Sequence, residues 1–232
     1  MQLINKRKDW FLDELVAEMA KRTLKVLKTA TKKRSEILRA NYILTIGTHY
    51  NPEQLIFLDE SSKDERTLSR HYGYSPKNTH AIQKVVFLRG TKYTILPALS
   101  LDGILAVDIM VGSYNKERFC AFILSQVLPL MNLYPQKNSV LVMDNAVIHH
   151  NVELVRIIKS IGCKVVFLPL YSPDYNPIEL AFSVIKSWLK KKELYRILFR
   201  SLFCFQLLLA CEQVTPDMTK EFYKSSIYLI YL

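Results

Sequence analysis

Several features that would assign this 232-residue chain to a specialised class are scarce or missing. Only six residues are glycine while half are apolar, which excludes a disordered or low-complexity chain. The four cysteines show no Cys-x-x-Cys spacing and lie in apolar contexts, which indicates reduced core thiols of an intracellular protein. The most apolar region, residues 197–211, contains Arg200 and Gln206 and is too short and too polar to span a bilayer. Because Lys6-Arg7-Lys8 follows the first few residues, we expect no signal peptide.

Positive charge is in surplus, and the surplus lies at the two ends. The net charge is +11; residues 1–50 carry 11 basic and 5 acidic groups, and residues 180–232 carry 8 and 4. Residues 51–179 are almost balanced, with 13 basic and 12 acidic groups. This distribution favours a polyanionic partner whose phosphates approach a neutral core from basic flanks, although the same surplus also serves solubility. Short basic clusters at residues 6–8 and 32–34 indicate nuclear import if the host is eukaryotic.

Two apolar runs without polar alternation end abruptly in acids. Leu55–Leu58 is followed by Asp59, and Val140–Met143 is followed by Asp144. Such runs predict strands that are buried on both faces, and their carboxyl ends are where α/β sheets place ligands.

A third apolar run, residues 163–170, ends in a turn that contains two prolines. Asn176 is then predicted to cap a helix, with Pro177 as its first residue and Glu179 as its third. Taken alone, Glu179 is explained as an acid in a first helical turn. Asp144 with Asn145 is likewise explained as an ordinary turn after a strand.

The acids are more informative together than alone. Two carboxylates about 4 Å apart repel each other by roughly 4 kcal/mol at an effective dielectric near 20. A divalent cation would turn that repulsion into binding, and hard oxygen ligands suit Mg²⁺ or Mn²⁺. We therefore expect Asp59→Asn or Asp144→Asn to raise the melting temperature of the metal-free chain.

Three stretches, LIFLDES (55–61), LVMDNAVIHH (141–150) and SPDYNPIELAFSVIKSWLK (172–190), resemble the DDE transposases of the mariner superfamily. Their order and the 34 residues between Asp144 and Glu179 fit the family. The resemblance implies a ribonuclease-H-like domain that cuts and joins DNA. It also implies that Asp59, Asp144 and Glu179 are the catalytic and metal-binding triad, with two Mg²⁺ or Mn²⁺ ions as cofactor.

The resemblance also implies supporting residues and a DNA-binding face. Asn145, His149 and Asn176 would support the site; His149 suits support better than ligation, because oxygen-preferring ions seldom choose imidazole. An ordinary structural histidine is the alternative. Basic residues near the acids would meet DNA phosphates, or would form a solvated face. They are Lys186, Lys190, Lys191, Lys192, Arg66 and Arg70.

The remaining patterns predict an α/β fold, a ribonuclease-H-like mixed sheet flanked by helices with a short helical amino-terminal extension. A right-handed crossover through residues 145–162 should place Asp59 and Asp144 on neighbouring strands. Residues 61–79 read as polar and turn-rich. Further strands are expected at residues 84–88, 91–100 and 103–111, and helices at 115–131 and 151–161. Three regions are predicted: a helical remnant of the DNA-binding or linker region (1–45), the catalytic domain (46–192) and a divergent helical segment (193–232).

Two functions of different classes remain open. The first is a metal-dependent DNA endonuclease and strand-transfer domain; the second is a catalytically silent nucleic-acid-binding or scaffold protein derived from a transposase. Residues 1–45 are too short for the family's paired recognition domains, and the divergent residues 193–208 indicate a degenerate copy. DNA, as transposon ends and target, is the expected partner, with a second copy of the chain as a further candidate and no membrane. An aspartyl phosphatase is disfavoured because Glu60-Ser61-Ser62 lacks a second aspartate.

Overall fold

The computed structural model describes residues 35–64, 91–146, 149–191 and 203–228, and its centre is one mixed sheet. The strands are β1 (Leu55–Leu58), β2 (Ser61–Asp64), β3 (Lys92–Ser100), β4 (Gly103–Val111), β5 (Val140–Met143) and β6 (Lys164–Phe167). The helices are α2 (Glu36–His49), α3 (Lys116–Phe122), α4 (Val152–Ser160), α5 (Ile178–Lys191), α7 (Phe203–Cys211) and α8 (Pro216–Ser225). Short single-turn helices at Pro52–Gln54 and Pro173–Tyr175 precede β1 and α5.

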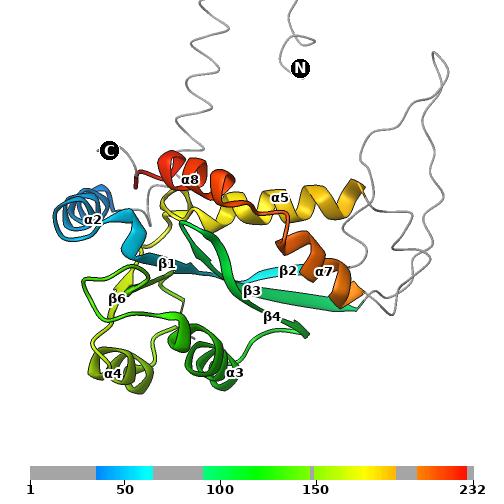
Figure 1. Cartoon of the computed structure of the whole chain (residues 1–232), viewed down its shortest axis with the longest axis horizontal. Coiled ribbons are helices and arrows are strands. Elements are labelled where there is room, and N and C mark those ends of the chain that lie inside the picture. Colours follow the sequence, from blue (N-terminus) through cyan, green and yellow to red (C-terminus); the bar gives the residue numbers. More distant parts are fainter. Residues whose placement is uncertain (1–34, 65–90, 147–148, 192–202, 229–232) are drawn as a thin grey trace, which may run out of the picture.

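Helices cover both faces of the sheet, so the domain has three layers (Figure 1). Helices α2, α5, α7 and α8 lie over one face, and α3 and α4 lie over the other. The buried strands supply side chains alternately to two apolar clusters: Phe57 and Val142 belong to the first, whereas Leu58 and Met143 belong to the second. A strand buried on both faces needs apolar residues at every position, which is why β1 and β5 show no alternation.

The strand pairing fixes where the acids emerge. β1 pairs in parallel with β5, and β5 pairs in parallel with β6. Leu58 is opposite Met143, so Asp59 and Asp144 leave the same edge of the sheet from neighbouring strands. This confirms the predicted mixed sheet flanked by helices and a parallel crossover from β5 to β6 through α4, whose cap Asn151 accepts a hydrogen bond from the Glu153 N–H.

Strand β2 was missed by the sequence patterns, which made residues 61–79 a polar, turn-rich segment. Ser61 and the three residues after it continue the line of β1 along the same edge of β3. The register on either side places Asp59 opposite Pro97, which has no N–H to donate to a ladder. The interruption between β1 and β2 thus lies at Asp59 and Glu60. The strand expected at 84–88 lies outside the described residues.

Other predicted boundaries also change. The helix expected over residues 115–131 is α3 followed by a π-helix (Ile123–Val127) and a 3₁₀ turn (Leu128–Leu130). Helix α5 begins at Ile178, one residue later than predicted. The limit drawn between residues 45 and 46 falls inside α2, whose Tyr42 and Ile46 are buried in the main core.

The carboxyl-terminal segment packs on the same core. Tyr223 of α8 is fully buried, and its hydroxyl donates to the Leu55 carbonyl at 2.9 Å. Thr219 donates to the Leu101 carbonyl at 2.9 Å. Helix α8 therefore belongs to the same core as β1 and α5. None of the helices in the described part of the chain is long and apolar enough to cross a membrane.

Candidate active site

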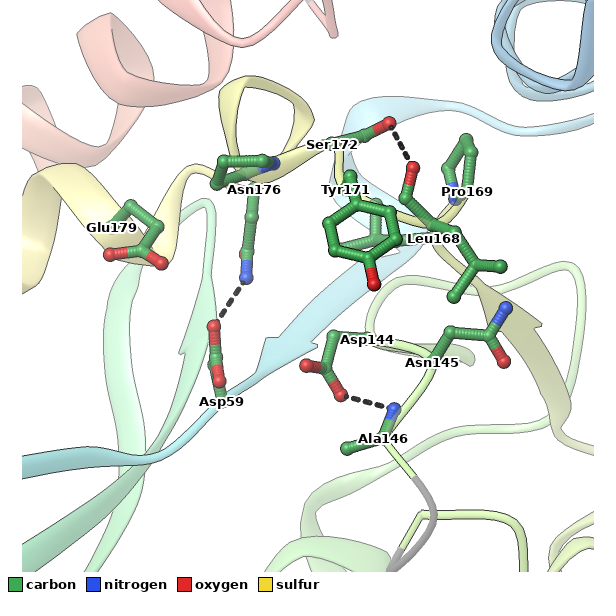
Figure 2. A pocket seen from close by; sticks show the side chains of 12 residues that line it. Asp59, Asp144, Asn145, Ala146, Leu168, Pro169, Tyr171, Ser172, Asn176 and Glu179 are labelled. Atoms are coloured by element: carbon green, nitrogen blue, oxygen red, sulfur yellow. Dashed lines mark hydrogen bonds between the residues drawn. The ribbon is translucent and has the colours of Figure 1, made fainter. Parts of the chain in front are cut away.

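The three predicted acids line one pocket at the carboxyl edge of the parallel strands. The pocket has a volume of about 340 Å³, and Asp59, Asp144 and Glu179 all contribute to its wall. Figure 2 shows the two aspartates at the ends of adjacent strands, with Glu179 on the far side of Asn176 from Asp144. The turn between β6 and α5 forms another part of the pocket wall. The remaining lining residues are Asn145, Ala146, Leu168, Pro169, Leu170, Tyr171, Ser172, Pro173 and Asn176.

Among the described residues, the hydrogen-bond donors to the Asp59 carboxylate are neutral. The Glu60 N–H donates to one oxygen at 2.8 Å, and the Asn176 amide donates to the other at 2.8 Å. Burial raises the pKa of Asp59, and repulsion from Asp144 and Glu179 raises it further, to about 7. Asp59 therefore carries an uncompensated charge when it ionises.

The Asp144 carboxylate is paired with a positively charged side chain, that of His149. His149 is fully buried, its Nδ1 contacts the Asp144 carboxylate, and its Nε2 lies 3.1 Å from Glu60 Oε1. Burial would lower the pKa of His149, but the hydrogen bonds to Asp144 and Glu60 outweigh it and raise the pKa to about 10. Burial alone would raise the pKa of Asp144; the bonds from His149 and from the Ala146 N–H instead bring it below its usual value.

His149 is fixed by packing as well as by charge. Its ring stacks on Phe119 of α3, with the ring centroids 4.4 Å apart. The neighbouring Asn145 side chain contacts His150, whose ring stacks on Phe167 at 4.6 Å. His149 and His150 are thus held against the face of the sheet that α3 and α4 cover.

The prediction that Asn176 caps α5 with its side chain is wrong. Asn176 is buried, and its amide donates to Asp59 instead of its oxygen accepting from the helix. The Asn176 Oδ1 atom has no hydrogen-bond partner among the described residues. The side chain therefore links the start of α5 to the end of β1, which is a direct contact between two parts of the site.

An ion pair from α2 anchors the turn that carries Asn176. Arg39 is buried and binds Asp174 through two nitrogens, at 3.0 and 2.6 Å. Its guanidinium also lies 3.8 Å from the centre of the Tyr175 ring. The Tyr175 carbonyl accepts from the Tyr228 hydroxyl at 2.6 Å. Both ends of the described chain thus hold the turn before α5.

The third acid and the lysines lie on α5. Glu179 is exposed in the first turn, and Ile178, Phe182, Ile185 and Leu189 bury the opposite side of the helix. Lys190 and Lys191 are exposed in the last turn, whereas the Lys186 amine lies 5.6 Å from the centre of the Phe182 ring. Lys192, Arg66 and Arg70 lie outside the described residues.

Sequence reasoning missed three residues that contact or shape the site. Glu60 could have been found, because it directly follows Asp59. Tyr171 could have been found as an aromatic residue between Pro169 and Pro173. Arg39 gave no such signal, because its partner Asp174 is 135 residues away in the chain.

The donor set fits a divalent cation in its chemistry. Three carboxylates and the amide oxygens of Asn145 and Asn176 border one pocket, and hard oxygen donors are what Mg²⁺ and Mn²⁺ prefer. The raised pKa of Asp59 shows that its ionised form is unfavourable beside the other acids, and a bound cation would offset that repulsion. In the described residues, however, no three His, Cys, Asp or Glu side chains are grouped so as to hold an ion. The Asp144 carboxylate is instead paired with His149.

Comparison with known proteins identifies a family. Residues 54–198, more than half of the chain, match the family of DDE superfamily endonucleases. A comparison with curated protein sequences gives no match.

Several solved structures share the fold. A pre-cleavage Mos1 transpososome is 16% identical, with a TM-score of 0.55 over 85% of this chain and 61% of that one. The Mos1 paired-end complex with the left transposon end is 16% identical, with a TM-score of 0.54 over 82% and 59% of the two chains. A Mos1 mariner paired-end complex with Mn is 14% identical, with a TM-score of 0.52 over 85% and 61%. The chain thus spans about three-fifths of the length of these transposases.

The family match includes β1, β5 and the start of α5, which are the elements that carry the three acids. The structural matches cover 82–85% of this chain. With its three acids around one pocket beside a ribonuclease-H-like sheet, this chain belongs to the DDE superfamily endonucleases and has the fold of a mariner-type transposase.

Proposed function

We propose that the chain is a transposase-type catalytic domain that cleaves and joins DNA with a divalent metal ion. The observation that carries the proposal is the shared pocket of Asp59, Asp144 and Glu179, in which the pKa of Asp59 is raised to about 7. Mos1 structures with transposon ends and with Mn support both the substrate and the metal.

Each acid has a distinct part in this proposal. Asp144, held ionised by His149, presents a carboxylate that needs no further proton loss to bind a cation. Asp59 carries a proton near neutral pH, and a cation would displace it. Glu179, on α5, would be the third carboxylate that binds the cation. A bound ion would activate a water or a 3′-hydroxyl and stabilise the leaving oxygen at the phosphorus.

Manganese-dependent nicking of supercoiled plasmid by the purified chain tests the proposal. We expect conversion to open circles with Mn²⁺ or Mg²⁺ and none with a chelator. The matched control is Asp144→Asn, which keeps the size of the side chain but removes the charge, and which should abolish nicking. Equal nicking by Asp144→Asn would exclude this site as its source.

A silent DNA-binding or scaffold protein is the second candidate. It is favoured by the pairing of Asp144 with His149 and by the lack of a closed metal-ligand group in the described part of the chain. This candidate predicts DNA binding that is independent of metal and unchanged by Asp144→Asn. We retain the nucleus and a homodimer as proposals, to be tested by localisation of a tagged chain and by its mass in solution.

A further inference from the structure

Tyr171 is an exposed aromatic residue in the wall of the acid pocket. Its side chain is 55% exposed, and it belongs to neither of the two core clusters. Figure 2 shows its ring between Asn176 and the Leu168–Pro169 wall, with the hydroxyl directed toward Asp144 and Asn145 in this view. The ring is therefore part of the wall of the pocket that Asp59, Asp144 and Glu179 share.

The backbone at Tyr171 is held in an unfavourable conformation. Its φ is +56°, in the left-handed region that a bulky side chain rarely adopts. Strained residues of this kind persist where the surroundings fix them, and they cluster at ligand-binding sites. Here the flanking Pro169 and Pro173 restrict the turn, and the Ser172 hydroxyl donates to the Leu170 carbonyl at 3.3 Å.

The turn is also anchored from outside the pocket. The Arg39–Asp174 ion pair holds the residues immediately after it, so the ring stands on a rigid support. A fixed aromatic face costs little conformational entropy on binding, and every base offers a flat π surface to it.

We propose that Tyr171 is a nucleotide-binding residue, whose ring stacks on the base next to the phosphate held at Asp59, Asp144 and Glu179. This inference rests on the proposed function for the position of the phosphate. It extends that function by assigning a base contact that tolerates any sequence. Stacking on an aromatic ring is worth about 1–3 kcal/mol per base, which corresponds to about 5- to 150-fold in affinity.

The test compares two fluorescent single strands of ten nucleotides: oligothymidylate, and an abasic strand with the same number of phosphates. Binding of the full chain is measured by anisotropy with Ca²⁺, which has the charge of Mg²⁺ but looser coordination. We expect a preference for oligothymidylate of about 5- to 150-fold in the wild type, kept by Tyr171→Phe and lost by Tyr171→Gly. The melting temperature of Tyr171→Gly should be unchanged or higher, because glycine adopts a positive φ without strain.

Leu170→Ala is the matched control, because Leu170 is 47% exposed on the same wall but has no ring. It should keep the preference. A preference that is absent in the wild type, that Tyr171→Gly retains, or that Leu170→Ala loses equally overturns the inference. Plasmid nicking separates the two proposals: nicking without a base preference leaves the proposed function intact. A base preference that depends on Tyr171, without nicking, supports the stacking but contradicts the proposed catalysis.

Discussion

Asp59 and Asp144 occupy equivalent places at the ends of two paired parallel strands, yet their electrostatic environments are opposite. Asp144 has a buried histidinium beside it, and its pKa falls. Asp59 accepts hydrogen bonds from the Glu60 N–H and the Asn176 amide, both neutral, and its pKa rises to about 7. Position on a sheet edge therefore does not set the charge state of an acid; the residues that pack behind it do.

This difference divides the site into a permanent anion and a group that responds to pH. Asp144 is ionised throughout the neutral range because His149 stabilises its charge. Asp59 gains or loses its proton near neutrality, so its charge depends on what else is bound. The following predictions test that division, beginning with the support of Asp144.

His149→Ala should have the largest effect on stability. The change removes a fully buried cation and leaves the carboxylates of Glu60 and Asp144 facing each other without it. Breaking a buried ion pair from one side costs about 3–5 kcal/mol, and the lost ring contact with Phe119 adds to the effect. Urea unfolding at pH 7 measures this loss. His150→Ala, at an exposed neighbouring histidine, is the control and should cost far less.

The raised pKa of His149 gives this prediction a pH window. Because its folded pKa, about 10, lies above the ordinary value of 6.5, its contribution is complete below about pH 6 and is lost as the pH rises through 10. The gap between the wild type and His149→Ala should therefore narrow between pH 7 and pH 10. A gap that stays constant over this range would mean that His149 acts by packing alone.

Asp59→Asn should stabilise the metal-free chain at pH 8 by about 2–4 kcal/mol. The folded pKa of about 7 lies above the ordinary 3.8, so the stability linked to the protonated carboxyl is complete below about pH 4 and is lost as the pH rises through 7. The asparagine amide could also donate to Asn176 after that side chain flips. Thermal melts with a chelator at pH 4 and pH 8 should show the gain at pH 8 only.

Asp144→Asn should have the opposite sign, which corrects the expectation drawn from the sequence that both substitutions stabilise. The pKa of Asp144 is lowered, so its contribution is present above the ordinary carboxyl pKa and is lost as the pH falls through the folded value. Removing the charge should therefore lower the melting temperature at pH 8. Both variants should also lose the rise that metal gives the wild type, about 2.7 kcal/mol at one hundred times the dissociation constant. An Mn²⁺-induced rise that survives in either variant would contradict the metal site.

The sequence was sufficient for the acids but not for their different charge states. Four consecutive apolar residues before Asp59 and before Asp144 identify buried strands, and the strand ends place both acids on one edge. Asp144 is compensated by His149, only five residues further along the chain, but the charge on His149 also depends on its contact with Glu60, 89 positions away. Strand β2 was not predicted from the sequence for a related reason. Its residues are polar, and it forms because it continues the line of β1 along β3. Pairing between distant segments leaves no local pattern.

Arg39→Met should have a smaller effect, about 1–2 kcal/mol, because Asp174 is half exposed and can be solvated after the change. It should also loosen the turn that brings the Asn176 amide to Asp59. Since that hydrogen bond favours the ionised form, its loss should raise the pKa of Asp59 further. The pH at which the metal-free chain loses stability would then move upward. Glu36→Gln is the control, because Glu36 is exposed and contacts Arg39 only at 3.6 Å. If Arg39→Met leaves the pH dependence of stability unchanged, then the Arg39–Asp174 ion pair does not influence the pKa of Asp59.

The smallest effect is expected for a lysine on α5. This helix carries Glu179, and unlike the strands that end at the two aspartates it also carries exposed lysines. Lys190 lies eleven residues after Glu179 on α5, on the same side of the helix, and it is exposed. If Lys190 meets a DNA phosphate, Lys190→Gln should leave stability unchanged and reduce the log–log salt slope of duplex binding by about 0.9. The wild-type slope should be about −4 to −5 if five phosphates are neutralised, with little dependence on sequence. The ratio of wild-type to variant affinity should then shrink by about 3.5-fold between 50 and 200 mM salt.

Lys220→Gln on α8, where Lys220 pairs with Asp217 at 3.4 Å, is the matched control and should keep the wild-type slope. Equal slopes for both variants would make Lys190 part of a solvated face, whereas a hundredfold preference for one duplex sequence would show that phosphates do not dominate binding.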